Sequence, residues 1–297
     1  MKFGHSSTMT FPHKLADGLW AVGNYFFNLY VVTGEQAAAL IEVGVSAVVD
    51  GVIRQLDSLK ICPSFLVMTH PHADHVTGLA GLKERYKDGL VVAGEGASEF
   101  LSHPRAAAAI GPEDLHMTEA LKSFGINSGR PPVTEPPSLE NCLIARDGDQ
   151  IDLGGATLRF LRAAGHAPGE IVVHVPEKGA LITSDSLGFR FPGRGVFPLF
   201  FTGYSDYMAT LERLRGLCPA LVGPAHQGPI TGLDVPTAFE ESLQAATALR
   251  TRIRQDARNA DEIAAELLRE FYRDELRLYT EENILGCCKL IVKRAKD

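Results

Sequence analysis

Cysteine is scarce in this sequence, and its spacing excludes two kinds of small cross-linked domain. The 297 residues include five cysteines, which are scattered along the chain without a Cys-x-x-Cys pair. Disulfide frameworks and zinc knuckles both require closely and regularly spaced cysteines. We therefore expect reduced thiols in a cytoplasmic protein, and burial is the simplest role for the adjacent Cys287 and Cys288.

Long apolar runs and an excess of positive charge are also missing. No run approaches the roughly 18 apolar residues of a membrane-spanning helix, and residues 1–10 lack the apolar segment of a signal peptide. The chain carries 29 Lys and Arg against 36 Asp and Glu, a net charge of −7. Because nucleic-acid affinity comes mainly from basic residues that neutralise phosphates, we expect no nucleic-acid partner and no membrane partner.

The patterns that are present predict a sheet-rich domain followed by helices. Short β-rich runs with Gly-containing turns over residues 18–43 predict an antiparallel meander. Residues 97–140 interrupt the strand pattern with two helical pieces and a Pro-rich surface connection, and strand patterns resume from residue 143. We expect one domain over residues 1–235 that includes this helical insertion. Residues 236–297 are predicted to be a helical extension that packs on the same domain and covers the site or binds a partner subunit.

The strongest signal in the chain is the cluster His70-x-His72-x-Asp74-His75. Composition alone produces such a pattern in about one in a thousand chains of this kind. The cluster lies where a buried-looking strand ends and a helix begins, a usual place for functional groups held by a sheet. Because side chains alternate along an extended stretch, residues 70 and 72 point to the same side.

Three further residues share the setting of this cluster. His166, Asp185 and His226 each follow an apolar, strand-like run and are bracketed by Gly, Pro or Ser. This repeated context places them in loops at strand ends, which can converge on one edge of the fold. The other five histidines lack such settings, and we expect them to be ordinary surface or core residues.

These seven residues, together with the run Gly165-His-Ala-Pro-Gly-Glu170, resemble the metallo-β-lactamase superfamily, in particular its glyoxalase II-like branch. The long helical tail is similar to that of the quinolone-signal response hydrolases of the superfamily. The resemblance implies an α+β fold, the αββα four-layer sandwich, which binds two metals at one edge of two packed sheets. It assigns His70, His72 and His166 to the first metal, Asp74, His75 and His226 to the second, and a bridging position to Asp185. Imidazole and carboxylate ligands suit zinc, iron or manganese, and we expect two divalent ions, with zinc first.

Two departures from the family pattern bear on the chemistry. Where many relatives carry Asp-Thr-Gly after the third strand of the meander, this chain has Glu42-Val43-Gly44, so the usual carboxylate partner is longer or absent. Position 72 is His rather than the Glu of flavodiiron relatives, and no flavodoxin-like domain follows. The second departure favours hydrolysis over oxygen reduction.

The resemblance therefore predicts a metal-dependent hydrolase that uses a metal-bound hydroxide to cleave a thioester, ester or lactone. Asp74 is the predicted catalytic residue, which orients the nucleophile or carries its proton. Two alternatives stay open. One is a mononuclear iron oxygenase resembling persulfide dioxygenase, which requires weak loading at Asp74, His75 and His226. The other is a regulatory protein with a vestigial hydrolase site.

The segment that follows Asp185 concentrates aromatic side chains beside arginines. Next to a metal it is suited to form an apolar wall for an acyl chain or an aromatic ring, with Arg190 or Arg194 receiving an anionic group. Equally, these aromatics pack against the C-terminal helices or form a homodimer contact. Basic residues of the tail offer a second anion contact, although a solvated helix end explains them as well; they are Lys289, Lys293, Arg294 and Lys296. The candidates for substrate binding are Phe189, Arg190, Phe191, Phe197, Phe200, Phe201 and Tyr204.

Overall fold

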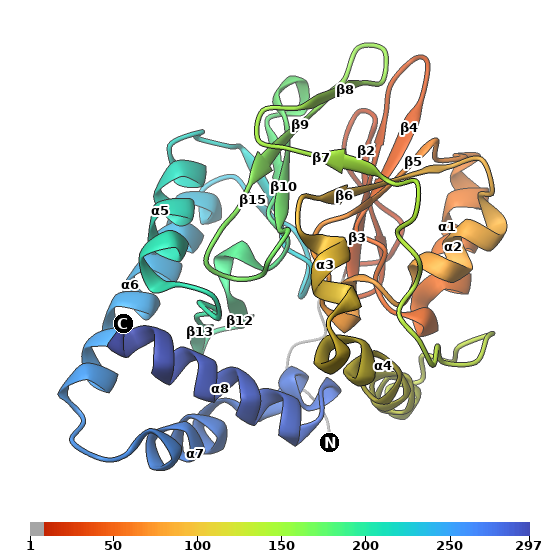
Figure 1. The fold of residues 1–297 in the computed structure, drawn as a ribbon. Coiled ribbons are helices and arrows are strands. Elements are labelled where there is room, and N and C mark those ends of the chain that lie inside the picture. Colours follow the sequence, from red (N-terminus) through yellow and green to blue (C-terminus); the bar gives the residue numbers. More distant parts are fainter. Residues whose placement is uncertain (1–8) are drawn as a thin grey trace.

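Two packed β-sheets lie between outer layers of helices in the computed structural model, which describes residues 9–297 (Figure 1). The expectation about a signal peptide concerns residues 1–10, most of which lie outside the described residues. Within the described part of the chain, no helix combines the length and the apolar character needed to cross a membrane.

The first sheet has seven strands, paired in the order of the chain. β2, β3 and β4 form the predicted antiparallel meander, β1 extends it at the edge as an antiparallel strand that was not predicted, and the next three strands add in parallel. Parallel neighbours need a crossover, which α1 (Val49–Leu59) and α2 (Leu79–Arg85) supply on the outer face. The strands are β1 (His13–Ala16), β2 (Leu19–Gly23), β3 (Asn28–Thr33), β4 (Ala38–Ile41), β5 (Phe65–Met68), β6 (Leu90–Gly94) and β7 (Leu143–Ala145).

The second sheet has six strands in the order β15-β14-β11-β10-β9-β8. Only β11 and β14 are parallel, and α5 (Tyr204–Arg215) connects them. A separate hairpin, β12 (Phe189–Phe191) and β13 (Gly195–Phe197), occupies the aromatic segment after Asp185. The strands of this sheet are β8 (Gln150–Asp152), β9 (Thr157–Arg162), β10 (Ile171–Val175), β11 (Ala180–Ile182), β14 (Leu221–Gly223) and β15 (Ile230–Thr231).

The central strands are apolar at nearly every position because both faces are covered. In β3, Leu29 and Val31 contact the core beneath the helices, whereas Tyr30 and Val32 contact the core between the two sheets. Side chains that alternate across a strand thus fill two apolar layers from one short segment. This double burial is the reason for the αββα sandwich that the sequence predicts, with α1 and α2 outside one sheet and α5 and α6 (Asp234–Gln255) outside the other (Figure 1).

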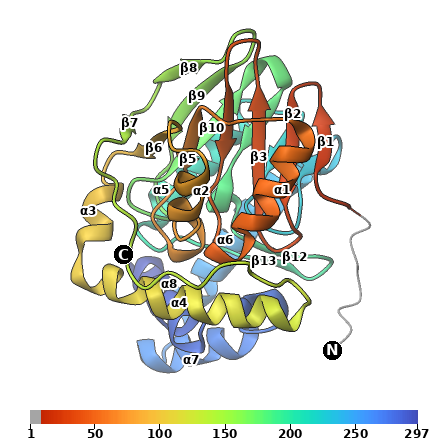
Figure 2. The ribbon, with the colours of Figure 1, turned by 90° about the vertical axis from the view of Figure 1, so that its right-hand side faces the viewer.

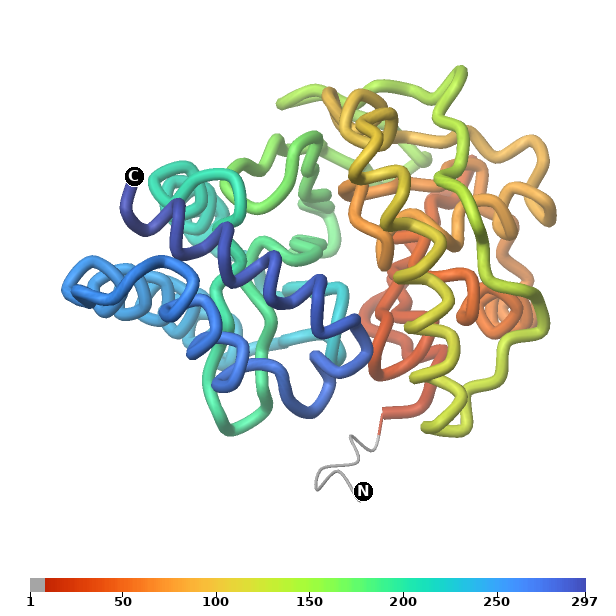
Figure 3. The backbone as a smooth tube through the Cα atoms, turned by 60° about the horizontal axis from the view of Figure 1, so that its bottom comes forward, coloured from red at the N-terminus to blue at the C-terminus, as the bar shows by residue number. Residues whose placement is uncertain are grey.

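The helical insertion and the C-terminal helices cover the same end of the sandwich (Figure 2). The insertion consists of α3 (Ala97–Ser102) and α4 (Pro104–Ser123), and irregular chain then leads to β7. The cap consists of α7 (Ala260–Phe271), the 3₁₀ helix η5 (Asp274–Leu278) and α8 (Glu281–Lys296), which follow α6. Seen from that end, the start of α8 lies next to α4 (Figure 3).

A buried carboxylate ties the insertion to the loops at the sheet edge. Asp114 of α4 is fully buried, and it accepts hydrogen bonds from the hydroxyls of Ser46 and Thr77 and from the backbone N–H of Val133. Its neighbour Glu113 accepts a hydrogen bond from the hydroxyl of Thr280 at the start of α8. Because a satisfied buried carboxylate is costly to disrupt, these contacts hold α4 and the cap at a fixed place over the edge.

Candidate metal centre

The loops that follow four strands meet at one edge of the sandwich, beneath the insertion and the cap. The loop after β5 supplies four side chains, two of them from the 3₁₀ helix η2 (Ala73–His75). The loop between β9 and β10 supplies His166, the 3₁₀ helix η4 (Ser184–Leu187) after β11 supplies Asp185, and the loop after β14 supplies His226. All seven predicted ligands therefore lie at this edge, in two compact groups.

The first group consists of three histidines whose ring nitrogens face one another. His70 Nε2 lies 3.1 Å from His72 Nδ1 and 3.3 Å from His166 Nε2. The far side of each buried ring is held by the protein: His166 Nδ1 lies 3.0 Å from the carbonyl oxygen of Leu199, and His70 Nδ1 lies 3.2 Å from the hydroxyl of Thr69. A ring nitrogen that donates to a carbonyl leaves the other nitrogen with a free lone pair, as a metal ligand needs.

The second group consists of two carboxylates and two histidines. His75 Nε2 lies 3.0 Å from Asp74 Oδ2 and 3.4 Å from Asp185 Oδ2. His226 Nε2 lies 3.4 Å from Asp185 Oδ1 and 3.5 Å from Asp74 Oδ2. The other nitrogen of His226 lies 2.6 Å from the carbonyl oxygen of Phe26, which fixes the ring.

Asp185 stands between the two groups. Besides its contacts in the second group, its Oδ2 lies 3.7 Å from His166 Nε2 and 4.0 Å from His70 Nε2. One carboxylate thus faces nitrogen ligands on both sides, which is the geometry that a bridging ligand needs. The bridging role itself stays a prediction.

Glu42 takes the place of the shorter carboxylate that the family resemblance implies. It is buried, its Oε2 lies 3.0 Å from His75 Nδ1, and its Oε1 accepts a hydrogen bond of 2.7 Å from the hydroxyl of Thr69. The backbone of Glu42 has a φ of 74°, in the left-handed region that non-glycine residues seldom occupy. The longer side chain therefore reaches the ring of His75 from an uncommon backbone conformation.

The two groups differ in charge as well as in composition. Burial lowers the pKa of His70 well below its usual value and that of His72 to about 3, and the neighbouring imidazoles act in the same direction. Burial also opposes a charge on His75, but the carboxylates of Asp74, Glu42 and Asp185 outweigh it and raise the pKa of His75 well above its usual value. For Asp74, burial favours the neutral acid, yet His75 and His226 hold its pKa well below the usual range. At neutral pH His70 and His72 are therefore uncharged, whereas His75 pairs as imidazolium with carboxylates.

The donors present fit metal ions. Every ligand atom in both groups is an imidazole nitrogen or a carboxylate oxygen, and the atoms of each group lie within 4.8 Å of one another. Among the described residues, the buried Nε2 of His75 forms no hydrogen bond although it faces two carboxylates. A buried polar atom seldom stays unsatisfied, and a shared cation would satisfy it. The set suits zinc, iron or manganese.

A cavity of about 650 Å³ opens beside the two groups. His72, Asp74, His166 and Asp185 form one wall. The remaining lining comes from α3 and α4, from the aromatic segment that follows Asp185, and from α8 with the residues just before it. Most of this lining is apolar, so the ligand groups lie at one end of a pocket suited to an apolar molecule.

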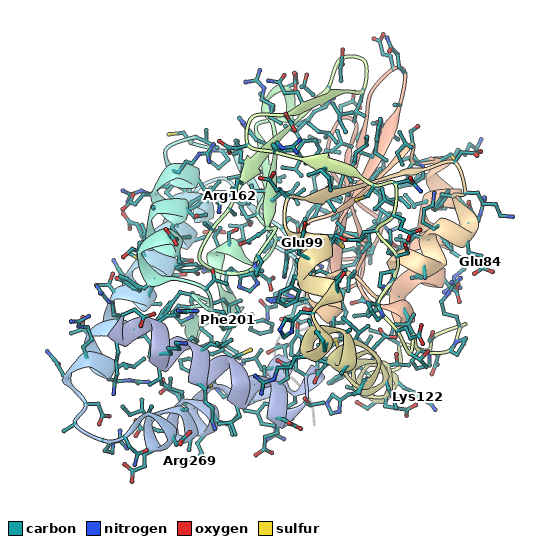
Figure 4. The ribbon with its side chains drawn as sticks, in the orientation of Figure 1. Glu84, Glu99, Lys122, Arg162, Phe201 and Arg269 are labelled. Carbon is teal, nitrogen blue, oxygen red and sulfur yellow. The ribbon has the colours of Figure 1, made fainter. Side chains whose placement is uncertain are left out.

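The structure divides the predicted substrate residues into two sets. Phe189, Phe197 and Phe201 line the cavity. Phe201 lies beside α8, and the guanidinium of Arg294 in that helix donates a hydrogen bond to its carbonyl oxygen (Figure 4). The others lie elsewhere. Arg190 and Phe191 line a second cavity of about 450 Å³ beyond His226, Phe200 is fully buried, and Tyr204 packs against Arg250.

The arginines and the tail lysines are also placed by their partners. Arg190 forms an ion pair with Glu241, and Arg194 with Asp274. Because both side chains are engaged away from the first cavity, their placement does not favour contact with an anionic substrate there. In the tail, Arg294 lines the cavity, whereas Lys289 pairs with Asp261. The alternative prediction for the aromatic residues was that they pack against the C-terminal helices. Phe197 does so, because its ring stacks on that of Phe271 at a centroid distance of 4.4 Å.

Sequence reasoning missed one residue that touches the centre. Tyr279, between η5 and α8, is buried, and its hydroxyl donates a hydrogen bond of 2.8 Å to Asp74 Oδ2 and lies 3.4 Å from His226 Nε2. Burial, with the nearby charge of Asp74, raises the pKa of Tyr279 well above its usual value, so the hydroxyl stays protonated. Nothing in the sequence around it marks it as functional, because its partner lies 205 residues away along the chain.

Comparisons with known proteins agree with this geometry. The family model described as the metallo-beta-lactamase superfamily matches residues 23–226. The metallo-beta-lactamase fold-containing protein ST1585 of Sulfurisphaera tokodaii is 28% identical over 220 residues, 73% of this chain and 77% of that protein. Its solved structure superposes with a TM-score of 0.60 at 24% identity, covering 90% of this chain and 98% of the other.

Two relatives carry the names of enzymes. The hydroxyacylglutathione hydrolase of Ruegeria pomeroyi is 32% identical over 151 residues, which are 50% of this chain and 42% of that protein. The acyl-coenzyme A thioesterase MBLAC2 of Bos taurus is 24% identical over 243 residues, with 73% of this chain and 81% of that protein covered. The first match leaves more than half of the hydrolase unmatched.

Proposed function

The chain belongs to the metallo-beta-lactamase superfamily, and from this premise we propose that it is a metal-dependent hydrolase of an acyl thioester, or of a chemically related ester or lactone. The observation that carries the proposal is the arrangement of two ligand groups, with Asp185 between them, at one end of a mostly apolar cavity. The named activities of the hydroxyacylglutathione hydrolase and the acyl-coenzyme A thioesterase support the choice of substrate class.

In this proposal two divalent ions occupy the centre, with zinc the first candidate. His70, His72 and His166 would hold one, and Asp74, His75 and His226 the other, and Asp185 would be shared between them. When bound, such ions lower the pKa of water toward neutrality and polarise the carbonyl oxygen of the substrate.

The protein's own side chains then orient the reactants. Asp74 faces the cavity and is ionised at neutral pH, so it accepts a hydrogen bond from the attacking water and can take its proton. Tyr279 donates to the same carboxylate oxygen and fixes its direction. Asp74 is buried, so water screens these polar contacts less than it would on an exposed surface. The products are a carboxylic acid and a thiol.

The shape of the second ligand group favours hydrolysis over the oxygenase alternative. A mononuclear iron oxygenase requires weak metal loading at Asp74, His75 and His226. These residues and Asp185 are as closely gathered as the three histidines of the first group, and Glu42 and the carbonyl of Phe26 hold the two rings.

A cytoplasmic location and a homodimer stay predictions from the sequence.

The test is a substrate panel assayed with protein stripped by a chelator and reloaded with zinc, manganese or iron. Thioesters, lactones, β-lactams and phosphodiesters are compared, and metal atoms per chain are counted by elemental analysis. We expect two atoms per chain and the highest turnover with thioesters. One iron atom per chain and oxygen consumption with a persulfide would instead establish the oxygenase, and full activity in the stripped protein would exclude both.

A further inference from the structure

Two helices that are far apart in the sequence form the apolar walls of the cavity. The insertion helix α4 contributes the apolar Ala106, Ala109 and Ile110 at helical spacing, flanked by Arg105 and Glu113. The cap helix α8 contributes one face in the same way, with Asn283, Ile284, Gly286, Cys287, Leu290 and Arg294. Leu290 is 40% exposed, so the wall leaves apolar surface open to a ligand.

The cavity is elongated along α8. Its lining on this helix runs from Asn283 to Arg294, and a rise of 1.5 Å per residue makes this about 16 Å. The ligand groups and Tyr279 lie at the start of this path, because Tyr279 immediately precedes α8 and reaches Asp74. An extended apolar chain attached to a reacting carbonyl at the metal centre therefore has a direction in which to lie.

Gly286 is the unusual residue on this path. Glycine in a helix interior destabilises the helix relative to alanine, so it needs a reason. The backbone does not supply one, because Gly286 is not among the described residues with positive φ, and a Cβ built on it meets no atom within 4 Å. Gly286 is an exposed residue that lines the cavity.

We propose that this part of the cavity holds the acyl chain of the substrate and that Gly286 determines how long a chain it accepts. The inference rests on the proposed hydrolase function. Between the polar residues at their ends, α4 and α8 present small or aliphatic residues, which suit a flexible, unbranched chain; they are Ala106, Ala109, Ile110, Ile284, Gly286 and Leu290. Since each buried methylene strengthens binding roughly fourfold, an elongated apolar wall converts chain length into selectivity.

The test replaces Gly286 by a side chain that fills the space and measures kcat/KM with acyl thioesters of N-acetylcysteamine, a small neutral thiol. For the unmodified protein we expect kcat/KM to rise from acetyl through butyryl and octanoyl to lauroyl. Gly286→Leu is expected to leave acetyl turnover within about twofold and to lower lauroyl turnover at least tenfold. An equal loss at every chain length, or no rise with chain length in the unmodified protein, overturns the proposal.

Two further variants keep the result interpretable. Gly51→Leu is the matched control, because Gly51 also lies in a helix, α1, without a close neighbour to a built Cβ, but it does not line the cavity. It should leave the chain-length profile unchanged. Ala109→Leu narrows the same path from α4, where the side chain is exposed, and it should reproduce the selective loss of long chains even if Gly286→Leu fails to fold.

A binding measurement separates this inference from the proposed reaction. Titration calorimetry with butyrate and laurate, the acids that hydrolysis would release, needs no turnover. Tighter binding of laurate than of butyrate, lost in Gly286→Leu and retained in Gly51→Leu, supports the acyl channel even if no thioester is cleaved. If thioesters are cleaved but both acids bind alike in all variants, the hydrolase stands and the acyl channel fails.

Discussion

The two ligand groups of the metal centre are neighbours, yet different parts of the molecule hold them. The first group, three histidines, is held by residues of the sandwich: the hydroxyl of Thr69 and the carbonyl of Leu199. The second group also depends on Glu42, which replaces the family's shorter carboxylate, and on Tyr279 of the cap, which lies outside the residues that the family model matches. The first group is thus held by the sandwich, whereas the second also depends on the cap.

The charge difference between the two groups should also affect how each of them binds a metal ion. In the first group, His70 and His72 have lowered pKa values and so offer free lone pairs at neutral pH. In the second group the carboxylates favour protonated His75 and His226, whose pKa values are raised against the effect of burial. A cation entering the second group must displace those protons, so the two groups should load differently.

The largest effect is expected from breaking the first group. His72→Ala removes a ligand that lines the cavity, and we expect kcat/KM with a thioester to fall about a thousandfold or more, because several kcal/mol of metal stabilisation is lost. His72 is partly exposed, so the melting temperature of the chelated protein should change little. The control is His174→Ala, a partly exposed histidine of β10 away from the centre. Activity that survives both this substitution and chelation would contradict the mechanism.

Breaking only the second group tests whether Glu42 has taken over the role of the shorter carboxylate. We expect Glu42→Gln to weaken metal binding there about 10- to 100-fold, because the partner that orients His75 loses its charge. The first group should keep its metal, so elemental analysis at limiting metal should approach one atom per chain. Glu35→Gln, at an exposed position nearby, is the control. Loss of both metals together would mean that the groups do not load separately.

Measuring the metal affinity of each group as a function of pH tests the charge difference between the two groups. The pKa of His75 in the metal-free protein is raised, so lowering the pH through that value adds a proton that competes with the cation. Affinity of the second group should therefore weaken by about tenfold per pH unit for each proton displaced, whereas His70 and His72 of the first group carry no proton to displace near neutrality. Calorimetry in two buffers with different heats of ionisation counts the released protons. Equal proton release at both groups would remove the distinction.

Much of this site could be predicted from the sequence because its ligands lie at strand ends. The sequence shows a buried run followed by His70-x-His72-x-Asp74-His75, and three isolated ligands that each follow another apolar run. This pattern indicates both the metal donors and the edge of the sandwich where they lie. The strands were predictable where both faces are buried, as in β3 and β5. Short or partly exposed edge strands such as β1 and β15 were not, since little apolar pattern marks them.

The cavity walls could not be predicted in the same way. Residues 189–197 form the hairpin β12–β13, in which Phe189 and Phe197 line the first cavity and Phe191 lines the second. A hairpin this short has too few residues for the sequence to indicate which side chains point to which cavity. The helices α4 and α8 face each other only through the tertiary fold.

Tyr279→Phe tests the most distant of these contacts and should have the smallest effect. The ring stays buried in the cap, but the donor to Asp74 Oδ2 is lost, and a hydrogen bond to a charged group contributes about 1.5–3 kcal/mol at most. We expect kcat to fall about tenfold with an unchanged KM for an acetyl thioester, since Asp74 loses orientation rather than charge. Tyr204→Phe, whose exposed hydroxyl lies 3.5 Å from that of Thr247, should retain full kcat. If Tyr279→Phe also retains full kcat, the cap only encloses the substrate. Glu42 is then the remaining contact that distinguishes the second group from the first.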